Sequence, residues 1–117
     1  WVSEALEHGP GLYAPEDVLH AIQAREMQLW LACEGEEPIG CVTTSVERFP
    51  RKTVLLIGIV GGNGARRWIK GMDQLLAAFA KAEGCDLQLA EGRPGWARFV
   101  GNGWHEMTRT FAREIER

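Results

Sequence analysis

Apolar residues recur roughly every three or four positions in residues 65–83, whereas the charged residues of this stretch fall mostly on the opposite face. Gly84 follows directly and is well placed as a C-terminal stop. The pattern therefore predicts one long amphipathic helix that packs on a core. Its apolar face is predicted to consist of Trp68, Met72, Leu75, Leu76 and Phe79.

Shorter runs on either side of this helix are rich in β-branched and apolar residues, which favour strands. Residues 27–33 and 39–49 are separated by the turn "EGEEP" and predict an antiparallel hairpin. Residues 53–60 are nearly all apolar and predict a central strand that is buried on both faces. A short strand is predicted at 85–90 and a final strand at 104–115.

The remaining segments predict helices. Residues 2–8 and 15–26 have helical spacing, and "RPGWARF" predicts a short helix that begins at a proline. A strand, a helix and a second strand of these lengths form a parallel pair with a right-handed crossover. The order of the elements therefore predicts an α+β fold with a mixed, mostly antiparallel sheet flanked by helices.

Size and charge exclude several classes of protein. The 117 residues are enough for one core, so we expect a single domain over 1–117; the chain begins at Trp1, which leaves open whether the native N-terminus is complete. The apolar runs are too short to span a bilayer. A net charge of -3 and a pI of about 5.6 give no overall positive charge for binding a polyanion, and only a local basic patch stays open. We therefore expect neither membrane insertion nor nucleic-acid binding.

Cysteine and histidine give no metal motif. Cys33, Cys41 and Cys85 are widely spaced and form no CxxC pair, so they are interpreted as buried thiols in a reducing, cytoplasmic compartment. A redox or zinc role is the alternative. The three histidines, His8, His20 and His105, form no known ligand pattern, and no metal is predicted.

The glycine cluster "GGNG" stands between the predicted central strand and the long helix. Gly61, Gly62 and Gly64 would let backbone approach a phosphate at the helix N-terminus, and Arg66 or Arg67 would add positive charge. The alternative is that the glycines only permit a tight turn and the arginines are solvated. The run fits the dinucleotide fingerprint poorly and lacks the lysine and hydroxyl pair of a P-loop.

Three stretches taken in order resemble the GNAT-type N-acetyltransferases, and together they cover nearly the whole chain. The run "LWLACEGEEPIGCVTTSV" is similar to a hairpin of that family, and "LLIGIVGGNGARRWIKGMDQLLAAFAKAEGC" is similar to its cofactor strand, pyrophosphate loop and helix. "RPGWARFVGNGW" resembles its late helix and the Gly-aromatic pair, here Gly103 and Trp104. The "GG" and "GRPGW" runs look most like small GNAT-like proteins of phages and prophages.

The resemblance implies that acetyl-CoA, or another acyl-CoA, is the cofactor and that a primary amine is the substrate. The pyrophosphate would lie on residues 62–66 and the pantetheine arm along 56–60. The amine would attack the thioester directly and would need a base and an acid. The implied cofactor-binding residues are Ile59, Val60, Gly61, Gly62, Asn63, Gly64, Ala65 and Arg66.

The catalytic side chains of the family pattern are not all present. Phe99 occupies the position of the tyrosine that often acts as the acid, and residues 53–60 contain no carboxylate. The candidates for the base, acting through water, are therefore Glu47, Glu106 and His105. Ser45 or Cys41 is the candidate for a weak proton donor.

The second hypothesis is a non-catalytic interaction or virion-assembly protein built on the same fold, in a host cytoplasm or a virion. Of the five tryptophans, Trp68 and Trp104 are predicted to lie in the core. Trp1, Trp30 and Trp96 are the candidates for an exposed aromatic residue that binds a protein partner.

Overall fold

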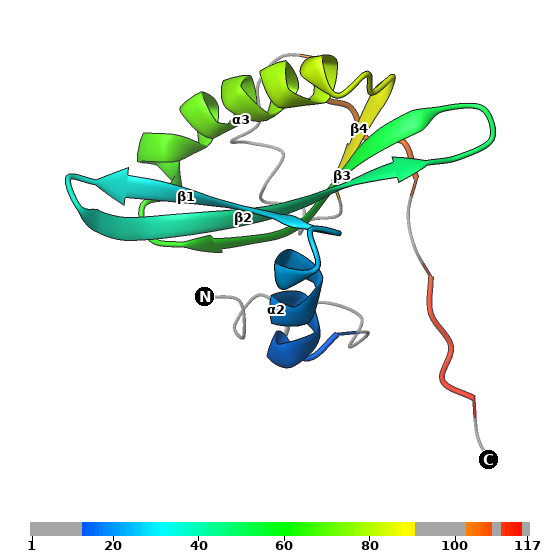
Figure 1. Ribbon diagram of the computed structural model, residues 1–117, viewed down its shortest axis with the longest axis horizontal. Coiled ribbons are helices and arrows are strands. Elements are labelled where there is room, and N and C mark those ends of the chain that lie inside the picture. Colours follow the sequence, from blue (N-terminus) through cyan, green and yellow to red (C-terminus); the bar gives the residue numbers. More distant parts are fainter. Residues whose placement is uncertain (1–12, 91–102, 109–110, 116–117) are drawn as a thin grey trace.

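The computed structural model of the protein describes residues 13–90, 103–108 and 111–115. α3 lies on one face of the sheet and α2 lies on the other (Figure 1), so the predicted α+β fold with a mixed sheet is confirmed. The predicted helix at 2–8 and the short helix at "RPGWARF" lie outside the described residues. The elements are α2 (Pro15–Gln23), β1 (Gln28–Glu34), β2 (Glu37–Arg48), β3 (Thr53–Gly62), α3 (Ala65–Ala82) and β4 (Leu87–Ala90).

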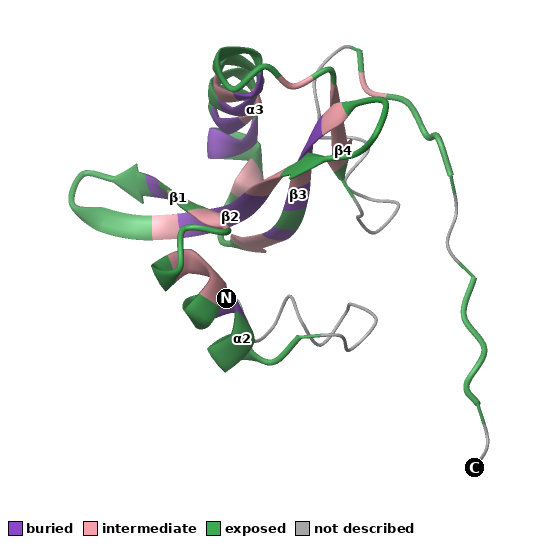
Figure 2. Ribbon diagram, turned by 45° about the vertical axis from the view of Figure 1, so that its right-hand side comes forward, coloured by how far each residue is buried: buried purple, intermediate pink, exposed green. Residues whose placement is uncertain are grey.

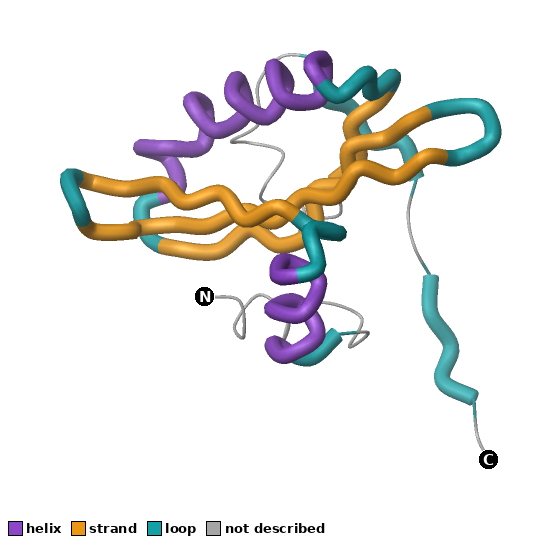
Figure 3. The backbone as a smooth tube through the Cα atoms, viewed as in Figure 1, coloured by secondary structure: helices purple, strands orange, loops and turns teal. Residues whose placement is uncertain are grey.

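The four strands lie in the order β1-β2-β3-β4. β1 pairs with β2 and β2 with β3 in antiparallel fashion, whereas β4 pairs with β3 in parallel after the chain has crossed over through α3. Figure 3 shows the long β2–β3 ribbon that forms the centre of the sheet. The predicted hairpin, central strand and parallel pair are all present. The Phe49 N–H closes the β2–β3 turn by donating to the Lys52 carbonyl at 2.9 Å.

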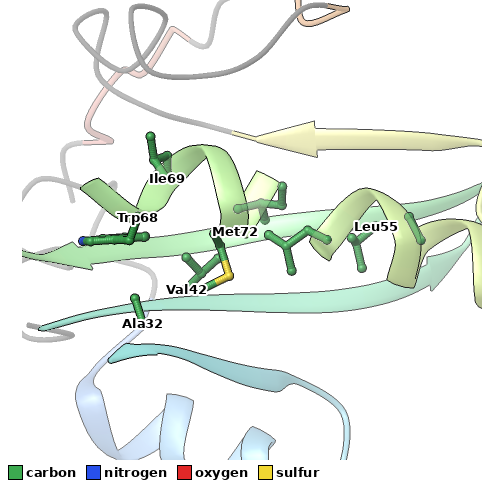
Figure 4. Packing of buried hydrophobic residues seen from close by; sticks show 9 residues of the cluster. Ala32, Val42, Leu55, Trp68, Ile69 and Met72 are labelled. Atoms are coloured by element: carbon green, nitrogen blue, oxygen red, sulfur yellow. The ribbon is translucent and has the colours of Figure 1, made fainter. Parts of the chain in front are cut away.

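The main core lies between α3 and the sheet (Figure 4). Four of the five predicted apolar positions of α3 contact this core, but the fifth, Leu75, is 51% exposed. Ile69 and Ala80 are buried instead, so the buried face of α3 is turned away from Leu75 relative to the predicted face. The buried members of the core are Ala32, Val42, Leu55, Ile57, Trp68, Ile69, Met72, Leu76 and Ala80.

The predicted stop at Gly84 is confirmed. Gly84 has a φ of 73°, and its N–H donates to the Lys81 carbonyl at 3.1 Å. The next N–H, of Cys85, reaches back to the Ala80 carbonyl at 2.9 Å. This pair of bonds satisfies two carbonyls of the last helical turn and directs the chain into β4.

α2 is shorter than predicted. The Ala14 N–H donates to the Asp17 carboxylate at 2.8 Å, which caps the start of the helix. The helix ends at Gln23 because Arg25 takes a φ of 61°, outside the helical range. Val18 is buried, whereas Leu19 is 55% exposed.

The predicted final strand at 104–115 is wrong for the described residues. Residues 104–108 and 111–115 form no strand, and Met107, Phe111 and Ile115 are 56%, 89% and 79% exposed. Figure 2 shows this segment as an exposed trace that runs away from the sheet. Its uneven alternation does not specify a partner strand, and a strand forms only where its backbone is paired.

Candidate functional site

β3 contains a β-bulge near its C-terminal end. The pairing register slips between Val42 and Thr44, so that Gly58 and Ile59 of β3 lie opposite the single residue Thr43 of β2. The Ile59 N–H donates to the Thr43 hydroxyl oxygen at 2.9 Å. The bulge changes the direction of the strand just before the glycine cluster.

β3 also continues beyond β4. The parallel pairing runs from Val54 opposite Leu87 to Ile57 opposite Ala90, where β4 ends. Among the described residues, none pairs with β3 on that side beyond Ile57. Within the described residues, positions 58–62 thus extend beyond the paired part of β4, next to the bulge and at the carboxyl end of a parallel pair, where open sheets commonly bind ligands.

Two of the glycines belong to the strand rather than to the turn. Gly61 pairs with Cys41 and Gly62 with Gly40, so β3 extends two residues beyond its predicted end. Gly62 has a φ of 127°, and a Cβ atom there would stand 2.3 Å from the Gly40 Cα and 2.4 Å from the Ile39 carbonyl oxygen. Close packing of β3 on β2 therefore requires this glycine even without a ligand.

The turn itself consists of Asn63 and Gly64, and its backbone is held on both sides. The Asn63 N–H donates to the Ile39 carbonyl at 2.8 Å, and the Trp68 indole N–H donates to the Asn63 carbonyl at 3.0 Å. Gly64 takes a left-handed φ of 60° and begins α3. The Arg67 N–H returns to the Gly64 carbonyl at 2.9 Å. The glycines therefore permit the tight turn that was one of the two alternatives. The turn places the N-terminus of α3 directly at the end of β3.

The charges at this helix start favour an anion. The first turn of α3 has no acidic residue and no side-chain cap, while Arg66 and Arg67 follow directly. Arg67 donates to the Glu34 carboxylate at 2.8 Å in an exposed ion pair. The N–H groups of Ala65 and Arg66 have no acceptor within the helix, because they precede its first repeating bond. A phosphate would meet these amides, the positive end of the helix dipole and the Arg66 side chain.

The candidate proton-transfer residues of β2 share one face. Alternation along β2 places Cys41, Ser45 and Glu47 on the same side as Thr43, away from α3. Glu47 is exposed and pairs with Val54, four positions before Gly58, which is roughly 13 Å along the strand. Ser45 is half-buried and lies nearer to the bulge.

The other candidates lie on a different element. His105 and Glu106 are exposed and follow Trp104, which is half-buried against the core and donates its indole N–H to the Asp73 carboxylate at 2.9 Å. The structure therefore does not bring the three proposed bases together on one element. Phe99, which occupies the position of the missing acid, lies outside the described residues.

The three cysteines differ in their surroundings. Cys41 is buried, and burial raises the pKa of its thiol, so the group keeps its proton. Burial likewise raises the pKa of the half-buried Cys85, with nearby Glu83 adding to the effect. Cys33 is exposed, so the prediction of a buried thiol is wrong there. In the described part of the chain no three potential metal ligands cluster, and no helix is long and apolar enough to cross a membrane.

Trp30 is not an exposed docking residue. It is half-buried, and its ring meets Phe79 of α3 edge to face with centroids 5.0 Å apart. Its indole N–H donates to the Thr44 hydroxyl at 2.9 Å. The prediction of an exposed aromatic partner site is therefore wrong for Trp30, while Trp1 and Trp96 lie outside the described residues.

A pocket lies at the opposite end of α3 from the glycine turn, between the last helical turn and β4. Lys81, Cys85 and Gln88 are among its lining residues. The Gln88 side-chain nitrogen is buried and has no hydrogen-bond partner among the residues that the structure describes. This pocket is the alternative place to look for a bound ligand.

Comparisons with known proteins show the same architecture. No family model matches the sequence, and no curated protein is similar enough in sequence to count as a relative. A probable acetyltransferase of known structure superposes with a TM-score of 0.71 at 12% identity, covering 99% of this chain and 88% of its own. An aminoglycoside acetyltransferase from an uncultured soil metagenomic sample, solved with sisomicin, gives a TM-score of 0.66 at 15% identity over 98% of this chain and 84% of its own.

An acetyltransferase from Trypanosoma brucei gives a TM-score of 0.67 at 15% identity, over 96% of this chain and 89% of that protein. Sequence identities this low indicate a shared fold but do not indicate a shared substrate. None of these descriptions indicates a phage source. The chain therefore has the GNAT fold that its sequence resembles.

Proposed function

We propose that this protein is an acyl-CoA-dependent N-acetyltransferase whose cofactor lies along the bulged end of β3 and on the glycine turn. One observation carries the proposal: among the described residues β3 extends beyond its pairing with β4, bulges at Gly58, and leads through Gly64 into a helix start without a side-chain cap. Solved acetyltransferases share this fold over nearly the whole chain.

The residues of the site suit the two polar parts of an acyl-CoA. An extended pantetheine arm contains amides, which can pair with a strand edge in the manner of an added strand. Leu56 and Ile57 are already paired with β4, so we assign the arm to residues 58–60. The pyrophosphate would be held by the amides of Ala65 and Arg66, the helix dipole and the Arg66 guanidinium. Asn63 and Gly64 would position this helix start.

The chemistry is a direct transfer from sulfur to nitrogen. The amine nitrogen forms a bond to the acyl carbon, the carbon–sulfur bond breaks, the amine loses its surplus proton and the thiolate gains one. On this chain Glu47 would accept the amine proton through water, because it is too far from Gly58 for direct contact. Ser45 or the protonated Cys41 thiol would supply the proton to sulfur. His105 and Glu106 are the alternative bases on the segment after Trp104.

The test is a calorimetric titration with acetyl-CoA, followed by an assay for free CoA thiol with a panel of primary amines. Arg66→Glu should weaken acetyl-CoA binding by about tenfold or more, which is about 1.4 kcal/mol. The matched control is Arg51→Glu, which makes the same charge change in the turn at the opposite end of β3. Arg51→Glu should bind as the unmodified protein does. Equal losses in both variants would mean that net charge alone is responsible, which contradicts the assigned site.

A non-catalytic binding protein on the same fold is the second candidate. It is favoured by the absence of any titratable side chain along β3 and by the distance of Glu47 from the bulge. Binding of acetyl-CoA without thiol release for any amine would support this candidate. A phage source and a place in a virion gain no support from the matched structures. The three free cysteines support a reducing, cytoplasmic location.

A further inference from the structure

Thr43 occupies the bulge from the neighbouring strand. Its side chain is fully buried, at 0% exposure, and its hydroxyl oxygen accepts the Ile59 N–H at 2.9 Å. A Cβ atom on Gly58 would stand 3.2 Å from the same oxygen. The hydroxyl therefore lies between the two residues of β3 that form the bulge, and the small size of Gly58 accommodates it.

This hydrogen bond has a direct effect on the strand register. A bulge turns one backbone N–H away from the regular ladder, and a buried N–H without an acceptor is costly. Thr43 supplies that acceptor to Ile59, which is itself 9% exposed. The register matters here because a one-residue slip of β3 along β2 would move every following residue to the other face of the sheet.

We infer that Thr43 is a positioning residue for the acyl-CoA site: its hydroxyl holds the bulge and thereby sets the register of residues 58–62 against β2. The role rests on the proposed function. The register matters because the same residues would carry the pantetheine contacts and lead into the turn at Asn63, where the phosphate would bind. Thr43 does not contact the reacting atoms in this role, so it acts through the backbone of β3.

The adjacent Thr44 provides a matched control. It is also fully buried, at 1% exposure, and its hydroxyl accepts the Trp30 indole N–H and donates to the Gln28 side-chain oxygen, both at 2.9 Å. Its contacts are with β1 on the α3 side of the sheet and not with the bulge. Thr43→Val and Thr44→Val therefore each remove one buried hydroxyl of the same size from the same strand.

The experiment compares acetyl-CoA affinity by calorimetry and the exchange rate of the Ile59 amide by NMR in three variants. Thr43→Val should raise the dissociation constant by about tenfold or more and should speed Ile59 amide exchange. Thr44→Val should change the dissociation constant by less than about twofold and leave the Ile59 amide protected, although it loses two hydrogen bonds where Thr43→Val loses one. Thr43→Ser, which keeps the oxygen, should restore both properties.

The outcomes separate this inference from the proposed function. If the unmodified protein binds acetyl-CoA and Thr43→Val binds equally well, the positioning role is overturned and the proposed function stands. If the unmodified protein does not bind, both are overturned. Should Thr43→Val fail to fold, Thr43→Ser decides: a loss of about tenfold in affinity with a protected Ile59 amide would overturn the role, because the oxygen is present and the register is kept.

Discussion

The indole ring of Trp68 lies directly over Gly40, so closely that a Cβ atom on Gly40 would stand 2.4 Å from the indole Cζ2. Gly62 packs against the same residue from β3. The Trp68 indole N–H also donates a hydrogen bond to the Asn63 carbonyl. One side chain of α3 and one glycine of β2 thus locate the end of β3 and the start of the helix, the two parts from which the candidate site is built.

Gly40→Ala should destabilise the fold by about 1 to 3 kcal/mol, because the added methyl group overpacks the contact with Trp68. Gly71→Ala is the control, since Gly71 is an exposed position inside α3 where a Cβ atom meets no atom of the described residues within 4 Å. That substitution should stabilise the protein by about 0.5 to 1 kcal/mol. Denaturant melts of the two variants should move in opposite directions, and a shared direction would contradict this packing.

Gly62→Ala should lower stability in the absence of any ligand, by at least about 1 to 2 kcal/mol, because the residue needs a positive φ and the added methyl group would strike Gly40 and the Ile39 carbonyl. A ligand effect at this position is therefore inseparable from a folding effect. If thermal melts show Gly62→Ala to be as stable as the unmodified protein, the close approach of β3 to β2 is wrong.

Two adjacent leucines test the orientation of α3. Leu76 is 3% exposed and Leu75 is 51% exposed. Leu76→Ala should cost about 2 to 5 kcal/mol, whereas Leu75→Ala, which makes the same chemical change, should cost less than about 1 kcal/mol. Similar losses of unfolding free energy in urea melts would place both side chains in the core. The apolar face predicted from the sequence would then be correct.

The elements with strong side-chain periodicity were predictable. α3 has its apolar stripe and its glycine stop, and β3 has a nearly unbroken apolar run, so their places in the core followed from residue types alone. Leu75 was misassigned because it lies at the edge of the stripe, where helical spacing does not separate a covered side chain from an exposed one. The final strand was misassigned because the alternation of apolar and polar residues after Trp104 does not show which strand would pair with it.

The site was predictable only in part. The glycine cluster and Arg66 marked the helix start, and Gly58 inside an apolar run is a signal of a β-bulge, but the sequence does not show which residue of β2 lies opposite it. In the sequence Thr43 looks like any other strand residue. Its role in holding the bulge depends on which residue of β3 lies opposite it. Register is a property of the paired strands, so the hydroxyl in the bulge became visible only in the structure.

The buried thiol of Cys41 predicts a dependence of stability on pH. Burial raises its pKa, so the folded protein keeps the proton while the unfolded thiol ionises at its ordinary value of about 8.5. The contribution of Cys41 to stability is then complete below that value and is lost as the pH rises towards the folded pKa. Urea melts at pH 7.5 and 9.5 should show a smaller fall for Cys41→Ala than for the unmodified protein.

Thiol alkylation gives a second readout of the same burial. Iodoacetamide should modify the exposed Cys33 before it modifies Cys41 in the folded protein. Mass mapping that finds Cys41 modified first under native conditions would show that this face of β2 is open to solvent.

The position at which acetyl-CoA binds tests the proposed site most directly, and NMR titration of the backbone amides measures it residue by residue. At about a hundred times the dissociation constant, where binding stabilises the fold by about 2.7 kcal/mol, the largest shifts should occur at residues 58–60 and at Asn63 to Arg66. The amides of Arg51 and Lys52, at the opposite end of β3, should not move. No shift at millimolar acetyl-CoA, or shifts confined to the pocket at Lys81, Cys85 and Gln88, would contradict the proposed site.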